Sequence, residues 1–410
     1  MATLTGLTLN DVCLAIVDCE HKTAPTQAEG HPSVRTPNIG RGRLILEGVN
    51  RVSDETYEQW TQRMEPMAGD LILAREAPIG NVAIVPKGLK VCLGQRTVLI
   101  RADRAKVLPE YLVYLMLGDE IQGRIHSQSN GATVHHLNMK DIRGLALPAL
   151  PLMAEQRGKA FILSAYDDLI ENNARRIAIL EEMARRIYEE WFVRFRFPGH
   201  EGVRMVESEL GLVPEGWSVQ GLYDVADLTY GFPFKSNLFK EGGEGLGVIR
   251  IRDIRDDHTG TYTTETVDAK YRVADGDILV GMDGAFHMGR WAGGVAWLNQ
   301  RVVRFRPKVG IPRSWLFWVS EEPIKTLEAT IVGTTVAHLS ARDLKEMRLL
   351  VPSKAVLKAA ASALEPMNEL ELTLKKKNAN LRTTRDLLLP KLISGELDVS
   401  AATEPEALAA

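Results

Sequence analysis

Basic side chains gather in three short segments of the sequence, and they are the side chains best suited to bind another molecule. Segment 35–43 holds three arginines and no acid, and 301–313 holds five basic residues and no acid. Segment 250–257 interleaves three arginines with three aspartates. Arg and Lys neutralise phosphates, whereas Arg, Asn and Thr hydrogen-bond to base edges in the major groove of DNA. For each residue the competing interpretation is an ordinary surface or core side chain. The candidate contact residues are His21, Lys22, Thr23, Arg35, Thr36, Asn38, Arg41, Arg43, Tyr230, Lys235, Arg250, Arg252, Arg255 and Arg304.

Catalytic patterns are missing from the sequence. It contains no GxxxxGK[ST] phosphate loop, no HExxH helix, no Cys/His cluster with zinc-binding spacing and no Asn-Pro-Pro-Tyr/Phe motif. The glycine-rich stretch 242–247 neither clearly follows a strand nor opens a helix, so we interpret it as a turn. Asp70 and Glu76 lack the converging lysine that a metal-dependent nuclease uses. We therefore expect no catalytic site, no metal and no cofactor in this chain.

The chain contains an internal repeat of roughly 200 residues. Residues 69–73 recur at 276–280, and GATVHHL at 131–137 recurs as GTTVAHL at 333–339. The offset between the copies falls in order from 207 to 201 residues, as a duplication that lost a few loop residues would produce. The copies differ most in 20–65 against 228–272.

The repeated histidine motif and the repeated Gln-Arg pairs admit two interpretations. They contact phosphates or bases near a loop tip, or they form a structural turn that docks each domain onto its helix. Because a motif shared by both copies cannot distinguish two different target sequences, we favour the structural turn. The residues concerned are Thr133, His135, His136, Thr335, His338, Gln95, Arg96, Gln300 and Arg301.

Each copy divides into a globular part followed by a long helix. Strand-like runs with period-two alternation, separated by Gly and Pro, predict an α+β domain at 1–151 and another at 197–352. A 3-4 spacing of apolar residues predicts helices at 152–196 and 353–395. The two helices most simply pair with each other as an antiparallel coiled coil, which gives the chain an approximate internal two-fold repeat.

Finer expectations follow for the second helix and for the residues after it. Pro390 should end the helix, because proline lacks the backbone N–H that continues it. Lys375, Lys376 and Lys377 should form its solvent-exposed face, and residues 396–410 should form a flexible tail.

Composition narrows the class of protein. The chain has 410 residues, with 50 Lys and Arg against 53 Asp and Glu, a net charge of −3. Three cysteines make no disulfide framework, and the N-terminus does not resemble a signal peptide. No apolar run approaches the roughly 20 residues of a membrane span. We expect a reduced, cytoplasmic protein that binds DNA weakly when alone, because none of its segments is strongly basic.

Three stretches resemble the DNA-specificity (S) subunit of Type I restriction-modification enzymes, and the resemblance covers essentially the whole chain. They are RIYEEWFVRFRFPG at 186–199, GLVPEGW at 211–217 and DLLLPKLISGELDV at 386–399. ALPALPLMAEQ at 146–156 also fits the family, whereas the second copy keeps only Pro352 of that pattern.

The resemblance implies two target recognition domains, each reading one half of a bipartite, asymmetric DNA sequence. It makes 18–42 the preferred source of base contacts in the first copy. The helices would set the gap between half-sites and dock two modification (methyltransferase) subunits, which bind S-adenosylmethionine and methylate adenine. Restriction subunits would add translocation and cleavage that depend on ATP and Mg. The helix residues expected to bind partners are Tyr166, Ile177, Leu180, Ile187, Trp191, Leu374, Leu381 and Leu388.

Other functions remain open on the sequence alone. An orphan or Type II-like specificity protein would serve a methyltransferase without a restriction partner. A coiled-coil scaffold would use its paired domains to bind protein rather than DNA. A self-sufficient nuclease would cut DNA alone with a divalent metal.

Overall fold

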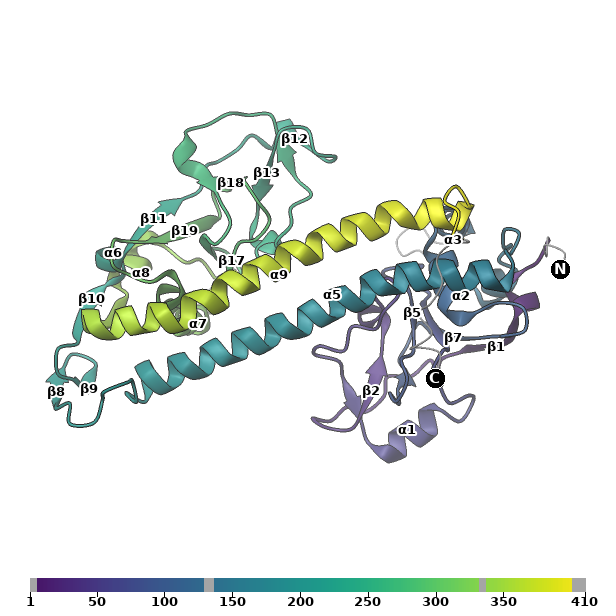
Figure 1. The fold of residues 1–410 in the computed structure, drawn as a ribbon, viewed down its shortest axis with the longest axis horizontal. Helices are drawn as coiled ribbons and strands as arrows, with labels where there is room; N and C mark the ends of the chain where they lie inside the picture. Colours follow the sequence, from purple (N-terminus) through teal and green to yellow (C-terminus); the bar gives the residue numbers. More distant parts are fainter. Residues whose placement is uncertain (1–5, 129–135, 332–336, 400–410) are drawn as a thin grey trace. The chain divides into compact units, whose positions relative to one another are not determined.

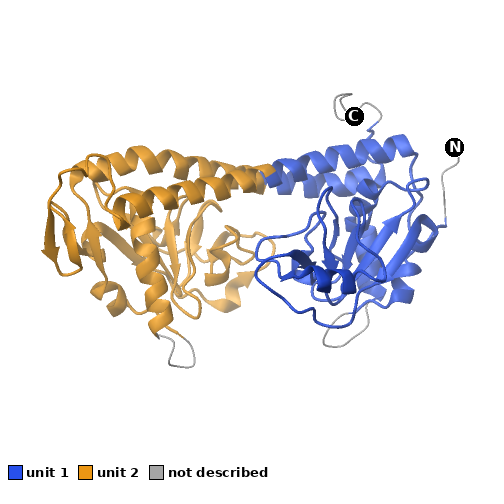
Figure 2. Ribbon diagram, turned by 90° about the horizontal axis from the view of Figure 1, so that it is seen from below, with its two compact units in different colours: residues 1–171, 380–410 blue, residues 172–379 orange. Residues whose placement is uncertain are grey.

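The structure, a computed structural model, describes residues 6–128, 136–331 and 337–399, and the chain divides into two units. Unit 1 comprises residues 1–171 and 380–410, and unit 2 comprises residues 172–379 (Figure 2). Each unit therefore holds one α+β domain together with a stretch of both long helices, as predicted for the fold class.

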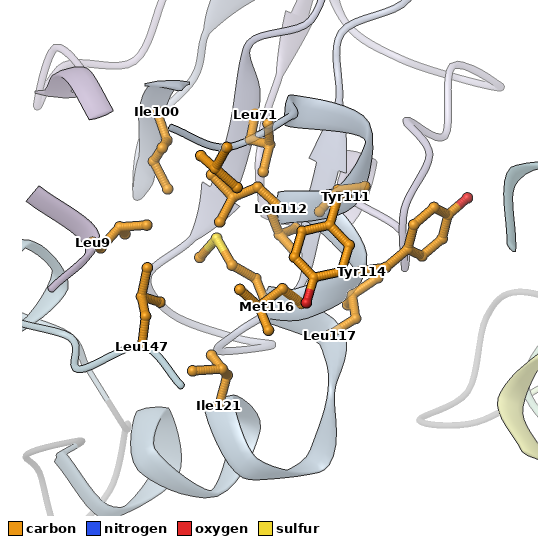
Figure 3. Packing of buried hydrophobic residues seen from close by; sticks show 14 of the residues in the cluster. Leu9, Leu71, Ile100, Tyr111, Leu112, Tyr114, Met116, Leu117, Ile121 and Leu147 are labelled. Carbon is orange, nitrogen blue, oxygen red and sulfur yellow. The ribbon is translucent and has the colours of Figure 1, made fainter. Parts of the chain in front are cut away.

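The domain of unit 1 is built on a four-stranded antiparallel sheet in the order β1-β7-β4-β5. Strands β1, β5 and β7 are labelled in Figure 1. Alternate side chains of the central strands enter two different clusters, since successive residues of a strand point to opposite faces. Leu71 and Ile100 pack with helix α2 (Pro109–Leu117), as Figure 3 shows. Ile72 and Leu99 pack with a smaller sheet. The strands are β1 (Cys13–Asp18), β4 (Leu71–Ala74), β5 (Val82–Ile84) and β7 (Thr97–Ala102).

The smaller sheet of unit 1 has the order β3-β2-β6, with β2 parallel to β6 and antiparallel to β3. Its strands are β2 (His31–Val34), β3 (Arg51–Val52) and β6 (Cys92–Leu93). The helices of the domain are α1 (Asp54–Trp60), α2 (Pro109–Leu117), α3 (Asp119–Gln128) and α4 (Met139–Arg143), with 3-10 turns η1 (Leu9–Val12) and η2 (Thr36–Asn38).

The domain of unit 2 repeats this plan, with a main antiparallel sheet in the order β11-β19-β16-β17. Its second sheet, β12-β14-β13-β18-β15, contains a parallel pair β13–β18 that corresponds to β2–β6. The internal repeat is thus confirmed, and the second copy has a larger accessory sheet. The strands are β11 (Ala226–Tyr230), β12 (Phe239–Lys240), β13 (Leu246–Ile249), β14 (Tyr262–Thr263), β15 (Arg272–Val273), β16 (Ile278–Gly281), β17 (Met288–Arg290), β18 (Ala296–Leu298) and β19 (Val302–Pro307).

Additional elements of unit 2 connect this domain to the helices. Strand β10 pairs with β20, and β8 forms a hairpin with β9. Their bounds and those of the helices are β8 (Met205–Ser208), β9 (Gly211–Pro214), β10 (Ser218–Gly221), β20 (Arg348–Val351), α6 (Leu222–Val225), α7 (Arg313–Ile331), α8 (Ala341–Glu346), η4 (Ser236–Leu238), η5 (Ile251–Asp253) and η6 (Ala269–Tyr271).

The two long helices are α5 (Met153–Tyr188), which continues as a π-helical turn at Glu189–Val193, and α9 (Lys354–Ser394). Within unit 1, Leu163 of α5 packs in one cluster with Leu389 and Leu392 of α9. Within unit 2, the buried Asn173 Nδ2 donates to Asn378 Oδ1 at 2.9 Å, and Ala184 packs in one cluster with Leu364. Later residues of α5 meet earlier residues of α9 in each unit, so the helices run antiparallel.

A buried carboxylate ties the domain of unit 1 to both helices. Asp167 on α5 is 3% exposed and accepts a hydrogen bond from the Tyr114 hydroxyl of α2 at 2.6 Å. Its other oxygen lies 2.5 Å from Arg385 Nη1 on α9. The Asp167 carboxylate raises the pKa of the Tyr114 hydroxyl together with burial, which is the larger cause. A buried charge is tolerated when it is paired and hydrogen-bonded, and Asp167 meets both conditions.

Unit 2 uses a different set of charges for the same purpose. Arg290 at the end of β17 forms an ion pair with Glu371 of α9, and both side chains are almost wholly buried. Arg290 also stacks over the ring of Phe317 at 4.3 Å. Lys375 Nζ lies 3.2 Å from both Glu371 Oε1 and Asp257 Oδ2, so it links α9 to the loop before β14. We call these four charged groups, Arg290, Glu371, Lys375 and Asp257, the unit 2 lock.

Three expectations about α9 and its end are corrected or narrowed. Lys375 does not belong to a solvent-exposed face, because it lies in the unit 2 lock, whereas Lys376 and Lys377 are exposed as predicted. Pro390 does not end the helix, which continues to Ser394 because Leu392 packs in the core of unit 1. Of the predicted tail, Val399 is 6% exposed and packs against Gly158, whereas 400–410 lie outside the described residues.

Replacing Glu371 by Gln should destabilise unit 2. The variant keeps the shape of the side chain but leaves the buried Arg290 charge unpaired, which typically costs about 3–5 kcal/mol. Tryptophan fluorescence during urea unfolding measures this loss, because six of the seven tryptophans lie in unit 2. Glu182→Gln is the control, since it breaks only the exposed pair with Arg186. Equal stability of the two variants would contradict the lock.

Candidate nucleic-acid interface

Four loop segments of unit 1 meet at one edge of its main sheet. Asp18 pairs with Val98 and Ala74 pairs with Thr97, so β1 and β4 end where β7 begins. Two backbone hydrogen bonds then join the loops. Arg75 N donates to Arg96 O at 2.9 Å, and Leu137 N donates to Arg75 O at 3.2 Å. We call this the loop edge of unit 1: residues 19–23, 75–76, 94–96 and 136–137.

Unit 2 forms the same edge with the same hydrogen bonds. Tyr230 pairs with Val303 and Gly281 pairs with Val302. Met282 N then donates to Arg301 O at 2.9 Å, and Met282 O accepts from Leu339 N at 2.8 Å. The loop edge of unit 2 therefore consists of residues 231–235, 282–283, 299–301 and 338–339.

The parallel strand pair brings one arginine to an equivalent position beside each loop edge. Arg35 directly follows β2, and Arg250 directly follows β13. Their backbones agree closely, with φ −106° and ψ 173° at Arg35 against φ −104° and ψ 166° at Arg250. Each backbone N–H is held by the side chain three residues later, Asn38 at 3.1 Å and Asp253 at 2.9 Å. The segments that contain Arg35 and Arg250 belong to the part of the repeat that differs most in sequence. Each nevertheless places an arginine directly after the equivalent strand.

The stem of Arg35 lies directly over Gly94 of the loop edge. A Cβ at Gly94 would lie 2.4 Å from Arg35 Cγ and 2.9 Å from the carbonyl oxygen of Val34, so only glycine fits there. The Arg35 side chain is exposed, whereas that of Arg250 is one-third exposed and donates to Thr261 Oγ1. Both arginines therefore lie beside a loop edge, but only Arg35 has an exposed side chain there.

Several other sequence candidates also lie on or next to the loop edges. His21 is 66% exposed and lies 3.1 Å from Asp18, and Lys22 and Thr23 are exposed. In unit 2, Lys235 is exposed, and the Tyr230 hydroxyl lies 2.7 Å from that of Tyr223. The exposed arginines that follow Arg250 on and after η5 are Arg252 and Arg255.

Five candidates have structural positions instead. Thr36 and Asn38 are buried, and Asn38 uses its side chain to hold the turn after β2. Arg43 pairs with Asp168 of α5, and Arg41, although exposed, donates to the carbonyl oxygen of Leu117 of α2 at 3.4 Å. Arg304 is 4% exposed and donates to Arg272 O and Thr229 Oγ1 within the sheets. Burial lowers the pKa of the Arg304 guanidinium, and a buried cation tied to the fold has no access to DNA.

The loop edges also contain a cluster that the sequence did not reveal as a unit. In unit 1, Glu76 lies between Arg96 Nε at 3.0 Å and His136 Nδ1 at 3.0 Å. In unit 2, Asp283 lies between Arg301 Nε at 3.1 Å and His338 Nδ1 at 2.5 Å. His136 and His338 thus each hold a loop-edge acid, while most of the repeated motif lies outside the described residues, so its role as a structural turn stays a prediction. Thr133, His135 and Thr335 lie outside the described residues.

Carboxylates that could serve a nuclease or a metal are engaged otherwise. Asp70 binds Arg101 through both oxygens, at 2.8 and 2.6 Å. Among the described residues, Asp18, Cys19 and His21 lie close enough together to hold an ion. Both Asp18 oxygens accept from Arg75 at 2.8 Å, and burial raises the pKa of the Cys19 thiol. A guanidinium beside the carboxylate and a protonated thiol both oppose cation binding.

The helix residues expected to bind partners lie largely in the seam between α5 and α9 or against the domains. Leu374 is 1% exposed and unavailable to a partner. The remaining seven, Tyr166, Ile177, Leu180, Ile187, Trp191, Leu381 and Leu388, are partly buried. The apolar residues that the helices do expose are Leu169, Ile179, Met183, Leu370 and Leu387. Within the described residues, no helix is long and apolar enough to cross a membrane.

Comparisons with known proteins agree with this architecture. The model of the type I restriction modification DNA specificity domain matches residues 8–182 and again 214–382. The chain is 24% identical over 366 residues to the MjaIX specificity subunit of Methanocaldococcus jannaschii, covering 87% of this chain and 83% of that protein. It is 31% identical over 156 residues to the EcoBI specificity subunit of Escherichia coli, covering 38% and 33%. The crystal structure of a type I S subunit from M. genitalium has a TM-score of 0.57 at 16% identity and 95% coverage of both chains, so it shares the fold.

Arg304 and Arg35 should behave differently when replaced by Met. Arg304→Met leaves the partners of a buried guanidinium unsatisfied, so we expect the free energy of unfolding to fall by about 1–3 kcal/mol. Arg35→Met changes an exposed side chain and should shift it by no more than about 0.5 kcal/mol. Urea unfolding followed by circular dichroism measures both. A destabilised Arg35→Met protein would give Arg35 a structural role instead.

Proposed function

The chain belongs to the type I restriction-modification DNA specificity subunits, and from that premise we propose that it reads a bipartite, asymmetric DNA sequence. Each unit binds one half-site through its loop edge and the arginine beside it. The chain itself is non-catalytic, and methylation and cleavage belong to the subunits that assemble on it.

One observation carries the proposal: two domains share a backbone frame and differ in the side chains mounted on it. Arg35 and Arg250 occupy the same position, but the exposed side chains near them differ: His21, Lys22 and Thr23 in unit 1, and Lys235, Arg252 and Arg255 in unit 2. The accessory sheet of unit 2 also has two strands more than that of unit 1. Base readout depends on which donors and acceptors enter the groove. Two such sets on one frame fit two different half-sites.

The charge balance supports recognition within a larger complex. A net charge of −3 gives the chain little long-range attraction for DNA. Partner subunits that close around the duplex supply the missing attraction. These are two modification subunits that bring S-adenosylmethionine, and restriction subunits that bring ATP and Mg.

The exposed apolar residues of the helices offer these partners a surface. Ile179 and Met183 lie four residues apart on α5, and therefore on one face of the helix, at 52% and 45% exposure. Large exposed apolar side chains on a helix favour contact with another protein. We assign the docking of a modification subunit to this face of α5.

Selection from random duplexes tests the proposed function. The chain in complex with its modification subunits should enrich a sequence of two short specified blocks separated by a fixed unspecified gap. Failure to enrich any bipartite sequence would overturn the proposal. Binding of protein but not DNA would favour the scaffold, and cutting by the chain alone with Mg would favour the nuclease.

The two arginines should then affect one half-site each. Arg35→Ala should reduce discrimination at one block by about 1–3 kcal/mol for the base it contacts, and Arg250→Ala should do so at the other block. The same selection, repeated with each variant, measures the effect. Arg204→Ala, an exposed arginine paired with Glu215 away from the loop edge, is the control and should leave both blocks unchanged. Equal loss at both blocks would contradict the assignment.

Lengthening both helices should change the gap and leave the blocks unchanged. Seven residues inserted after Glu171 in α5 and seven after Ala379 in α9 fall at the division between the units, so the contacts inside each unit are kept. A heptad preserves the apolar seam and adds about 10 Å, or roughly three base pairs, to the preferred gap. Sequencing of methylated sites measures the gap. Altered blocks with an unchanged gap would refute this role of the helices.

A further inference from the structure

The arginine–acid–histidine cluster occurs once in each unit and is built from the same atoms. The arginine uses Nε and the histidine uses Nδ1, each bonded to a different oxygen of the central carboxylate. The arginines are Arg96 and Arg301, which precede β7 and β19 by one residue. Both clusters lie on the loop edges defined above.

In both units the arginine nitrogen that the ion pair joins to the acid is Nε. Because Nε holds the carboxylate, the two Nη amino groups of each arginine remain available. Arg96 and Arg301 are 58% and 54% exposed, whereas Glu76 and Asp283 are only 20% and 26% exposed. A planar guanidinium oriented in this way presents two parallel N–H donors, which match two oxygens of a phosphate.

The histidines act as braces. His338 Nδ1 holds Asp283, and in unit 1 the second ring nitrogen of His136 is also engaged, by Asn138 Oδ1 at 3.0 Å. The donors common to both units are therefore those of the arginines. The acid and the histidine position them, and Arg96 adopts a left-handed backbone (φ 66°) that a simple turn would normally give to glycine.

The presence of the same cluster in both units indicates what Arg96 and Arg301 contact. Features that select sequence must differ between two unlike half-sites, as the segments around Arg35 and Arg250 do. A cluster that is the same in both units meets something that is the same at both half-sites. The sugar-phosphate backbone of DNA has that property, and it is an anion suited to arginine.

We propose that Arg96 and Arg301 are sequence-independent phosphate clamps, one for each half-site, held in place by Glu76–His136 and Asp283–His338. This rests on the proposed function, because it assumes that DNA lies against the loop edges. It separates two roles at each edge. The segments around Arg35 and Arg250, which differ between the units, select sequence, whereas Arg96 and Arg301 fix the position of the duplex.

The test measures binding of random-sequence duplexes against salt concentration, using the complex with its modification subunits. Each phosphate contact contributes about 0.9 to the slope of log K against log salt. Arg96→Gln and Arg301→Gln should each lower that slope by about one and weaken binding about tenfold at low salt. The bipartite sequence selected by each variant should equal that of the wild type. Arg96→Lys and Arg301→Lys retain the charge and should restore most of the slope.

Arg104→Gln is a closely matched control. Arg104 is 58% exposed and lies 3.0 Å from Glu110, as Arg96 lies 3.0 Å from Glu76, but it follows the opposite end of β7. It should leave the slope unchanged. For unit 2, Arg204→Gln serves likewise, because Arg204 is exposed and paired with Glu215 away from the loop edge.

The outcomes separate this inference from the function on which it rests. Wild-type slope in both Gln variants would overturn the clamps, even if the complex selects a bipartite sequence. Loss of modification-subunit binding on size-exclusion chromatography, with an unchanged slope, would make the cluster a protein contact instead. A lowered slope without any bipartite selection by the wild type would support the clamps and refute sequence reading.

Discussion

The register of three antiparallel strands is the constraint on which both interfaces depend. Because β1 and β4 flank β7, their ends and its beginning fall at one edge, and the same holds for β11, β16 and β19. The hydrogen bonds from Arg75 N to Arg96 O and from Met282 N to Arg301 O then fix the loops. A slip of one residue would turn every buried side chain to the other face. Core packing therefore holds the exposed loops in place, although they contribute little to it.

Buried charged residues on α5 and α9 attach each domain to its stretch of the long helices. The residues that do this differ between the two units. Asp167 meets Tyr114 and Arg385 in unit 1, whereas the unit 2 lock joins Arg290 to Glu371 and Lys375. Buried ion pairs gain little net stability, but their strict geometry permits few alternatives. They therefore specify how a domain sits on its own helix stretch. Two unrelated networks in equivalent places indicate that the requirement is geometric and that many residues satisfy it.

The sequence was sufficient to predict the repeat, the α+β domains and the two long helices, because each has a periodic or duplicated signal. Arg35 and Arg250 were candidates by composition, but their equivalence depends on backbone position in segments that share no sequence match. The predictions that Arg304 contacts DNA and that Lys375 is exposed on its helix are wrong for a common reason. The local sequence around a basic residue in a strand or helix does not indicate which polar group from a distant segment will pair with it. The clusters around Glu76 and Asp283 could not be predicted from the sequence for the same reason, because their members lie up to 60 residues apart.

The net charge of the chain, −3, does not predict the local charge that a ligand meets at a loop edge. Many acids are already neutralised inside the fold, and some of these pairs are themselves duplicated: Asp70 with Arg101 and Asp277 with Arg306, at 2.6 and 2.7 Å. Such pairs add to both sides of the net charge without projecting a field, because each dipole is short and partly buried. The side chain of Arg35 is exposed, and those of Arg96 and Arg301 remain 58% and 54% exposed although each is paired with an acid. The local sign of each loop edge follows from geometry, and a sum over the sequence cannot reveal it.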